Sequence, residues 1–330
     1  MQYVRVRWQD YFYQLVVEAR SSRGQMQDGV ERELTNALAA LKSMHAEIHY
    51  ELPEQEYSAS ERKSIIAQSS HAIARKTLDF CSALAQICFG RGYWLECEIT
   101  CHIAISIGKA LEEFRHVGWR LYDLARISFE RSDLEVAEQL ANQAMKIWKP
   151  LGPALENCHI YRMIGQIEQQ RGNINSARES FTQALKGYKQ LRDSASKPYV
   201  LHMEAALAEM RGDVAKAEDK YRQAIAVLQH AKNIGYAASL LYLHGRLAFR
   251  NDDTSQARED YKQSLEWAHD IHAANLIARN LCSLATLEAE TGNSETAKPF
   301  ARDALARCRR LSLVGEQTEM EHLLARLGVG

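Results

Sequence analysis

The apolar and polar positions of this chain repeat every 40 residues between residues 79 and 311. In the stretch 158–190, apolar residues at helical spacing predict one helix, and a second apolar stripe predicts another helix after a polar break at 171–173. The first stripe consists of Ile160, Met163, Ile164 and Ile167, and the second of Ala177, Phe181, Ala184 and Leu185. Six such units follow one another without an insertion, which predicts an array of helix-turn-helix repeats.

The break inside each unit has its own pattern. One column of the repeat is mostly glycine, which can end a helix in the left-handed conformation, and it reads Gly92, Ser132, Gly172, Gly212, Asp252 and Gly292. The next column is mostly Asp or Asn, and we expect five of its members to cap the second helix of their units: Asp133, Asn173, Asp213, Asp253 and Asn293. The turn chemistry therefore agrees with the apolar period.

Small residues recur where the two helices of a unit should approach each other closely. The column on the first helix reads Ala85, Ala125, Gly165, Ala205, Gly245 and Ala285. A column on the second helix is Cys97 followed by five alanines, and four residues after these alanines come aromatic residues in several units: Phe181, Tyr221 and Tyr261. We expect enlargement of a small residue to overpack this contact.

These columns resemble the tetratricopeptide repeat. The resemblance implies an all-α, right-handed α-solenoid of about six repeats, with an N-terminal helical cap and a C-terminal capping helix. Two features depart from the family pattern, because the period is 40 rather than 34 and the usual proline after the second helix is missing. The extra residues lie either in longer helices or in longer loops. We expect Pro299 to bend the second helix of the sixth unit.

The first 72 residues do not share the repeat. We expect helices over 4–20 and 28–50, a polar break at 51–58, and a long helix from Ser60 to Phe89. A final amphipathic helix is expected over 314–327. The predicted organisation is an N-terminal cap (1–72), a repeat array (73–313) and a C-terminal capping helix (314–330).

The N-terminal pattern resembles the segment that heads the repeat region of NB-ARC-type signalling ATPases, the STAND class. It comprises an aromatic-rich helix and then an acidic-Arg-acidic cluster with an Asn and an Ala-rich end: Trp8, Tyr11, Phe12 and Tyr13, followed by Glu31, Arg32, Glu33, Asn36 and 37–40. The resemblance implies a sensor arm that controls an ATPase switch. The chain has no GxxxxGK[ST] loop, so it is either a stand-alone relative or a fragment of a longer protein.

Composition narrows the classes of function. The net charge of -1 disfavours a broad nucleic-acid surface, and no apolar run or secretory signal indicates a membrane or an exported protein, so we expect a cytoplasmic location. No catalytic motif is present, and we predict neither enzyme activity nor a cofactor. Cys81, Cys88, Cys97 and Cys101 occupy columns that hold apolar or small residues in other units, so we expect reduced thiols in the core rather than a metal site.

A binding groove is the candidate site. In repeats of this type the first helix lines the concave face, and three of its columns are rich in Tyr, Trp, Arg and His, which commonly anchor interfaces. The predicted groove residues are Trp119, Tyr122, Arg126, His159, Arg162, Gln166, Tyr199, His202, Tyr242, Arg246 and Arg279. The arginines suit acidic side chains or a peptide carboxylate, and the tyrosines suit apolar side chains.

The leading prediction is therefore a non-catalytic protein-interaction module that binds a protein or peptide segment in a signalling or regulatory assembly. Two alternatives are a nucleic-acid-binding solenoid, which the charge disfavours, and an allosteric regulatory subunit of an ATPase or another effector enzyme. Self-association is a further alternative, because Trp8, Tyr11 and Phe12 are expected to expose apolar surface at the N-terminal cap.

Overall fold

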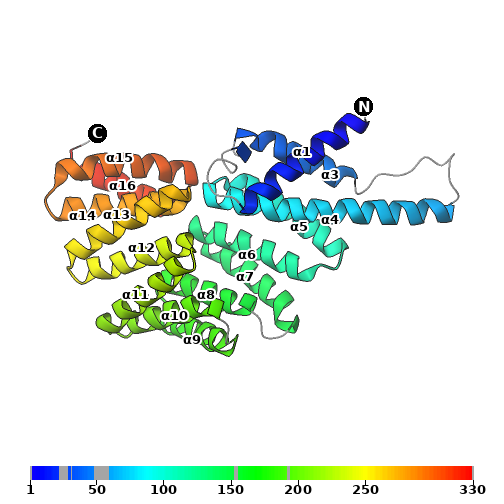
Figure 1. The fold of residues 1–330 in the computed structure, drawn as a ribbon. Coiled ribbons are helices and arrows are strands. Elements are labelled where there is room, and N and C mark those ends of the chain that lie inside the picture. The colour runs from blue at the N-terminus through cyan, green and yellow to red at the C-terminus, as the bar shows by residue number, and fades with distance from the viewer. Residues whose placement is uncertain are drawn as a thin grey trace. The chain divides into compact units, whose positions relative to one another are not determined.

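The computed structural model describes residues 2–21, 29–30, 32–47, 59–151, 155–191 and 194–328. Every regular element in these ranges is a helix, which confirms the predicted all-α class (Figure 1). The chain divides into two compact units, Met1–Leu124 and Ala125–Gly330, and the division falls inside α6 (Phe114–Glu130). The predicted domain boundaries at residues 72 and 313 stay predictions.

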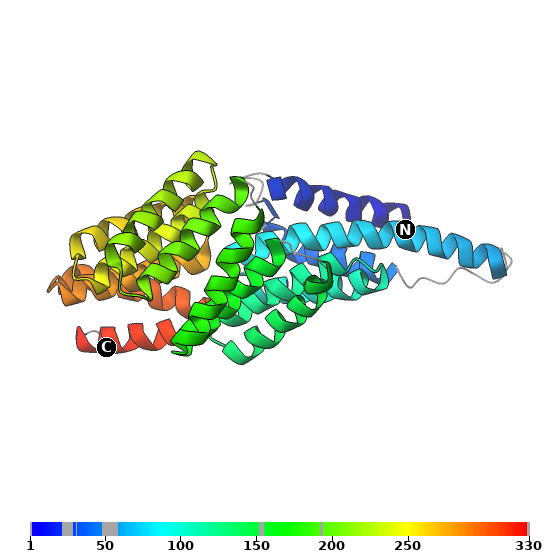
Figure 2. The same cartoon turned by 90° about the horizontal axis from the view of Figure 1, so that it is seen from below.

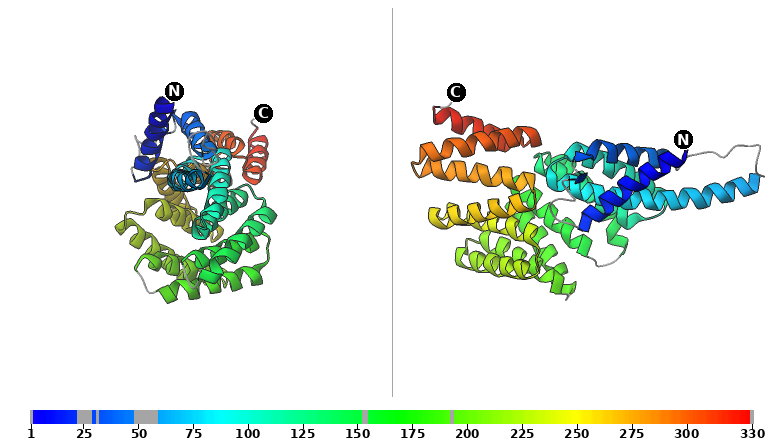
Figure 3. Two further views of the ribbon diagram at one scale, coloured as in Figure 1. Left: turned by 90° about the vertical axis from the view of Figure 1, so that its right-hand side faces the viewer. Right: turned by 45° about the horizontal axis from the view of Figure 1, so that its top comes forward.

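In the first unit, α1, α3 and α4 pack on one another and α4 also packs on α5 (Figure 3). These helices are α1 (Gln2–Ser21), α3 (Leu34–Glu47), α4 (Ala59–Arg91) and α5 (Trp94–Ala110). The expected helices over 4–20 and from Ser60 to Phe89 are confirmed, whereas Glu31 and the expected break at 51–58 lie outside the described residues.

The aromatic residues of α1 are only partly at the surface. Tyr11 is exposed and Trp8 is half-buried, but Phe12 is buried, so the expectation that it is exposed was wrong. Trp8 and Tyr11 each meet the ring of Phe12 edge-on, and Phe12 lies on the side of α1 that carries the buried Val16.

The second unit is a succession of antiparallel helix pairs (Figures 1 and 2). After the C-terminal part of α6 come α7 (Leu134–Trp148), the short η1 (Lys149–Leu151), α8 (Leu155–Gln170), α9 (Ile174–Leu191), the short η2 (Ser194–Ser196), α10 (Lys197–Glu209), α11 (Val214–His230), α12 (Ile234–Arg250), α13 (Thr254–Asp270), α14 (Ala274–Glu290), α15 (Ser294–Leu311) and α16 (Val314–Arg326). The expected final helix is confirmed. Helix α15 continues through Pro299, and a bend there stays a prediction.

The 40-residue period consists of two long helices and two equally short turns. Helices α11 to α14 each contain 17 residues, so the residues added to the usual 34 lie in the helices rather than in loops. Every member of the predicted turn column has a positive φ, including Ser132 at 64° and Asp252 at 62°. The turn between units repeats this geometry 20 residues later with non-glycine residues: Glu112, Lys232, His272 and Ser312.

The capping prediction is correct for the three aspartates, Asp133, Asp213 and Asp253, which accept a hydrogen bond from the backbone N–H three residues later. It was wrong for Asn293, which forms no side-chain cap. Its amide donates instead to Glu288 at 2.8 Å, and Asn173 donates in the same way to Glu168 at 2.9 Å. An amide has a donor that a carboxylate lacks, and a glutamate five residues earlier engages it.

The small-residue columns lie where the two helices of a unit touch. A Cβ atom added to Gly165 would come within 2.6 Å of the Phe181 ring, and one added to Gly245 would come within 2.9 Å of Tyr261. Ala177, the small residue on the second helix of the unit that contains Gly165, is fully buried. Aromatic residues of the second helix therefore reach the backbone of the first because no side chain stands between them.

We predict that Gly165→Ala lowers the free energy of unfolding by roughly 1–3 kcal/mol, because the methyl group overpacks Phe181. Gly315→Ala is the matched control, since Gly315 is helical and an added Cβ would meet nothing within 4 Å. The control should raise stability by about 0.4–1 kcal/mol. Chemical denaturation monitored by circular dichroism measures both, and equal effects of the two substitutions would contradict the close-contact explanation.

Candidate functional site

The predicted groove residues differ widely in exposure. Tyr122, His159 and His202 are buried, with 4%, 7% and 5% of their surface exposed. Arg246 is exposed, and the remainder are half-buried: Trp119, Arg126, Arg162, Gln166, Tyr199, Tyr242 and Arg279. Trp119 and Tyr122 belong to the first compact unit, where their rings meet edge-on at 5.8 Å. The other predicted groove residues belong to the second compact unit. Their role in partner binding stays a prediction.

A chain of aromatic rings, which we call the Tyr–His ladder, runs from α8 to α12. Its members are His159, Tyr188, Tyr199, Tyr236, His202 and Tyr221. The Tyr188 hydroxyl is 2.8 Å from Nδ1 of His159, and the Tyr236 hydroxyl is 2.7 Å from Nδ1 of His202. Tyr199 joins these two pairs, because it stacks on Tyr188 at 5.1 Å and meets Tyr236 at 5.0 Å. His202 in turn lies 6.1 Å from the Tyr221 ring.

The ladder combines three predicted residues with three that the sequence analysis did not assign to the site. His159, Tyr199 and His202 were predicted, whereas the other three were not. Tyr221 had a usable signal, since it fills the aromatic column of the repeat. Tyr188 and Tyr236 lie outside that column. Tyr188 contacts α8 of its own repeat unit and Tyr199 of the next, and Tyr236 contacts α10 of the preceding unit.

Both ladder histidines are neutral at neutral pH. Burial, and then the positive charges of Arg162 and Arg126, lower the pKa of His159 from 6.5 to about 3. Burial, and then Arg162, lower the pKa of His202 to about 3 as well. A neutral imidazole accepts a hydrogen bond at Nδ1, so each can accept from its tyrosine hydroxyl. The positive charges of these arginines therefore reach the ladder histidines.

The more accessible part of the predicted stripe carries arginine next to polar or aromatic side chains. Arg162 donates to Oε1 of Gln166 at 3.2 Å, one turn further along α8. Arg246 follows Tyr242 by one turn of α12 and lies over its ring, with the guanidinium carbon 5.9 Å from the ring centroid. A guanidinium beside an aromatic face suits a ligand with an anionic group next to an apolar one.

Arg279 already has acidic partners. Its Nη1 atom lies 3.0 Å from a carboxylate oxygen of Glu130 on α6, and its Nε atom lies 3.1 Å from Glu316 on α16. Tyr242 also lies within its electrostatic reach and, with the two glutamates, raises the pKa of Arg279 against the opposing effect of burial. A ligand carboxylate would therefore compete with two protein carboxylates for this side chain.

His244 and Asp260 form a buried pair between α12 and α13. Nδ1 of His244 lies 2.6 Å from Oδ2 of Asp260, and Gln256 donates to the other carboxylate oxygen at 2.9 Å. His244 is 5% exposed and Asp260 4%, so the pair packs inside the array. The His244 ring also faces Tyr221 at 6.3 Å, which extends the ladder towards α13.

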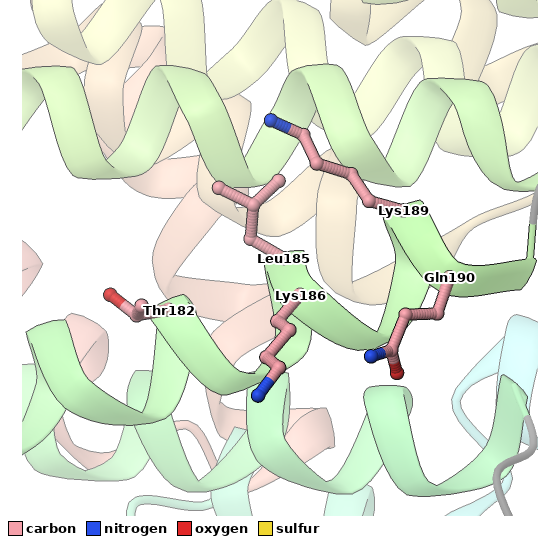
Figure 4. Close-up of a pocket in the computed structure, with 5 residues that line it drawn as sticks. All are labelled: Thr182, Leu185, Lys186, Lys189 and Gln190. Atoms are coloured by element: carbon pink, nitrogen blue, oxygen red, sulfur yellow. The ribbon is translucent and has the colours of Figure 1, made fainter.

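A shallow hollow lies on α9 (Figure 4). It is lined by Thr182, Leu185, Lys186, Lys189 and Gln190, all from that one helix. Lys189 is paired with Glu204 on α10 at 2.7 Å. None of the predicted groove residues lines this hollow, and it brings together no polar groups from different elements.

Other classes of site have little support in the described part of the chain. There, no three His, Cys, Asp or Glu side chains come close enough together to hold a metal ion. All seven cysteines are buried, which confirms that they pack in the core. None of the described helices combines the length and the apolarity that a membrane span requires.

Comparison with known proteins identifies the class. The family model for the tetratricopeptide repeat matches residues 238–270, which include most of α12 and all of α13. No curated protein matches the chain. A Rap protein complexed with Competence and Sporulation Factor is similar over 99% of this chain and 98% of its own, with 13% identity and a TM-score of 0.54.

Two further solved structures have a similar fold. The Rap conjugation gene regulator of plasmid pLS20, in complex with the Phr* peptide, covers 98% of this chain and 94% of its own, with 14% identity and a TM-score of 0.56. A STAND protein with a tetratricopeptide repeat sensor from Pyrococcus horikoshii covers 90% of this chain and 42% of its own, with 12% identity and a TM-score of 0.51. The chain therefore contains a tetratricopeptide repeat at residues 238–270, and its fold is similar to that of helical-repeat proteins.

The buried neutral histidines predict how stability depends on pH. Between about pH 6.5 and about pH 3 the unfolded chain binds protons that His159 and His202 in the folded chain do not. The contribution of these histidines to the free energy of unfolding is therefore fully present above about pH 6.5, and it decreases as the pH falls towards 3. Each histidine should remove about 2 kcal/mol of unfolding free energy between about pH 7.5 and about pH 5.

Denaturant titrations at these two pH values test this expectation. His202→Gln should remove the contribution of one histidine to the pH dependence, whereas His230→Gln should not, because His230 is exposed. A wild-type unfolding free energy that does not change over this range would contradict the neutral ladder.

Proposed function

We propose that this protein is a sensor or scaffold whose second unit binds a peptide or an extended protein segment along the predicted stripe. The observation that supports this proposal is that the half-buried Arg162 on α8 and the exposed Arg246 on α12 lie within electrostatic reach of the ladder residues His159, His202 and Tyr221. The hydroxyls of Tyr188 and Tyr236 are bonded to the two imidazoles, and we expect these bonds to hold the ladder side chains in place. A rigid backing reduces the entropy that a bound segment would have to overcome.

The preferred ligand in this proposal carries an acidic side chain or a free C-terminal carboxylate. Arg126 and Arg162 already act on the ladder histidines through their charge, so an anion at this surface would meet a favourable potential. Arg246 adds an exposed guanidinium on α12, next to the ring of Tyr242. These groups suit a carboxylate followed by an apolar side chain.

Similar proteins support a peptide as the ligand. Two of the Rap structures are complexes, one with Competence and Sporulation Factor and one with the Phr* peptide, and both share the fold of this chain over nearly its whole length. The likeness to a STAND protein with a repeat sensor supports a place in a signalling assembly, where an ATPase or another effector would respond to the bound segment. The net charge of -1 continues to disfavour nucleic acid.

Selection from a displayed library of random peptides with free C-termini tests this function. We expect the wild-type chain to enrich peptides with acidic groups. Tyr242→Ala combined with Arg246→Ala should weaken the binding of the enriched peptides by about tenfold or more. Tyr and Arg side chains commonly contribute most of the binding energy at interfaces. Fluorescence anisotropy with a labelled peptide measures the change, and circular dichroism confirms that the variant is folded.

Arg222→Ala is the matched control, since Arg222 is exposed on α11, the second helix of its unit, and lies 3.9 Å from its nearest acidic partner. It should leave peptide affinity unchanged. Enrichment of no peptide, or equal weakening by the control and the double variant, would contradict the proposal.

A further inference from the structure

Two cysteines of the sixth repeat unit touch across its helix pair. Cys282 lies in the middle of α14 and Cys308 near the end of α15, and their Sγ atoms are 3.7 Å apart. They are 5% and 0% exposed. A disulfide bond requires about 2.05 Å between the sulfurs, so the two atoms need to approach by about 1.7 Å. Small side-chain and backbone adjustments on the two helices can supply that movement.

Packing alone does not require sulfur at these two positions. The equivalent positions pair Arg162 with Tyr188 in the third unit, and Tyr242 with Ala268 in the fifth. The repeat therefore accepts large, small and charged side chains in these columns. In the sixth unit both columns contain cysteine, and the two thiols lie on different helices, as an interhelical disulfide would need.

The last helix, α16, covers Cys282. Two contacts from α16 flank this residue on α14: Arg279 pairs with Glu316 at 3.1 Å, and Thr286 donates to Glu319 at 3.1 Å. The contact with Cys308, then burial, and then the charges of these two glutamates raise the pKa of the Cys282 thiol above its ordinary value. The thiolate is the reactive form, so the pair reacts slowly while α16 is docked.

We propose that Cys282 and Cys308 form a site of reversible oxidation, where a low-molecular-weight disulfide such as oxidised glutathione converts the two thiols into a disulfide between α14 and α15. One thiol loses its proton and attacks a sulfur of the small disulfide, releasing one small thiol. The second thiol loses its proton and attacks the mixed disulfide at the protein sulfur, releasing the other small thiol. The protein loses two hydrogens and the oxidant gains them.

The bond would join the two helices of the sixth unit and close the loop between residues 282 and 308. Such a cross-link restricts the unfolded chain, so it should raise the melting temperature by roughly 5–10 °C, and dithiothreitol should reverse the rise. The sixth unit would then resist local opening in an oxidising environment and open more readily in a reducing one.

Incubation of the full chain with oxidised glutathione, followed by peptide mapping without reduction, tests the proposal. We expect a cross-link between the peptides that contain Cys282 and Cys308, together with the reversible rise in melting temperature. Cys308→Ser should abolish both. Absence of the cross-link, or glutathione retained on either cysteine without a cross-link, would overturn the proposal.

Cys97 and Cys101 provide an internal control. They lie one turn apart on the single helix α5, where Cβ atoms are about 5–6 Å apart, beyond the roughly 3.5–4.5 Å that a disulfide needs. They should stay unlinked in the same sample. Cross-links among several cysteines would indicate oxidation of an unfolded chain and would also overturn the proposal.

The covering role of α16 has a separate test. Glu316→Gln combined with Glu319→Gln weakens its contacts with α14 and should accelerate formation of the cross-link several-fold. Glu295→Gln, which removes one negative charge at an exposed position of α15, should leave the rate unchanged. Equal rates in all three proteins would show that α16 does not control access, even if the disulfide forms.

Discussion

The close approach of the two helices in each repeat unit is the constraint on which the rest of this structure depends. At Gly165 and Gly245 the first helix presents bare backbone to the aromatic side chain of the second. The same contact at Ala205 holds Tyr221 between His202 and His244, within 6.3 Å of both rings. A larger residue in this column would push the second helix away and separate the rings. The small-residue columns therefore maintain both the packing of the array and the ladder behind its candidate binding surface.

Equal spacing of the turns preserves this contact from one unit to the next. A left-handed residue occurs every 20 residues in the described turns, and four of the turns between units place a side chain there: Glu112, Lys232, His272 and Ser312. That conformation costs about 1–2 kcal/mol for a residue other than glycine. The turn at Lys232 offsets part of the cost, because Asn233 N–H donates to Leu228 C=O at 2.8 Å and so satisfies a carbonyl at the end of the helix.

The sequence allowed prediction of the helices and of one turn in each unit, because these depend on local patterns. Apolar spacing located α4 and α16 to within a few residues, and the glycine column located the left-handed turns. Exposure along the candidate stripe was not predictable in the same way. A column of the repeat shows which side of its own helix a residue occupies, whereas the burial of His159 and His202 depends on Tyr188, Tyr199 and Tyr236 from other helices. The partner of Arg279 on α6 is 149 positions away, beyond the reach of any local pattern.

Differences between units explain how one repeated framework can support distinct local properties. In a repeat array each unit contacts mainly its neighbours, so a change in one unit acts locally. The third and fourth units contain neutral imidazoles next to arginines, whereas the sixth contains two thiols beneath α16. Arg279 is an exception, because its ion pairs connect the sixth repeat unit both to α16 and to α6 in the second repeat unit. Because Arg279 lies one turn from Cys282 on α14, movement of α16 would release one of its carboxylate partners and leave its charge to Glu130 alone. The Arg279 side chain thus connects the end of the array to an earlier repeat unit through its ion pairs, whereas the packing of each helix pair depends on that pair alone.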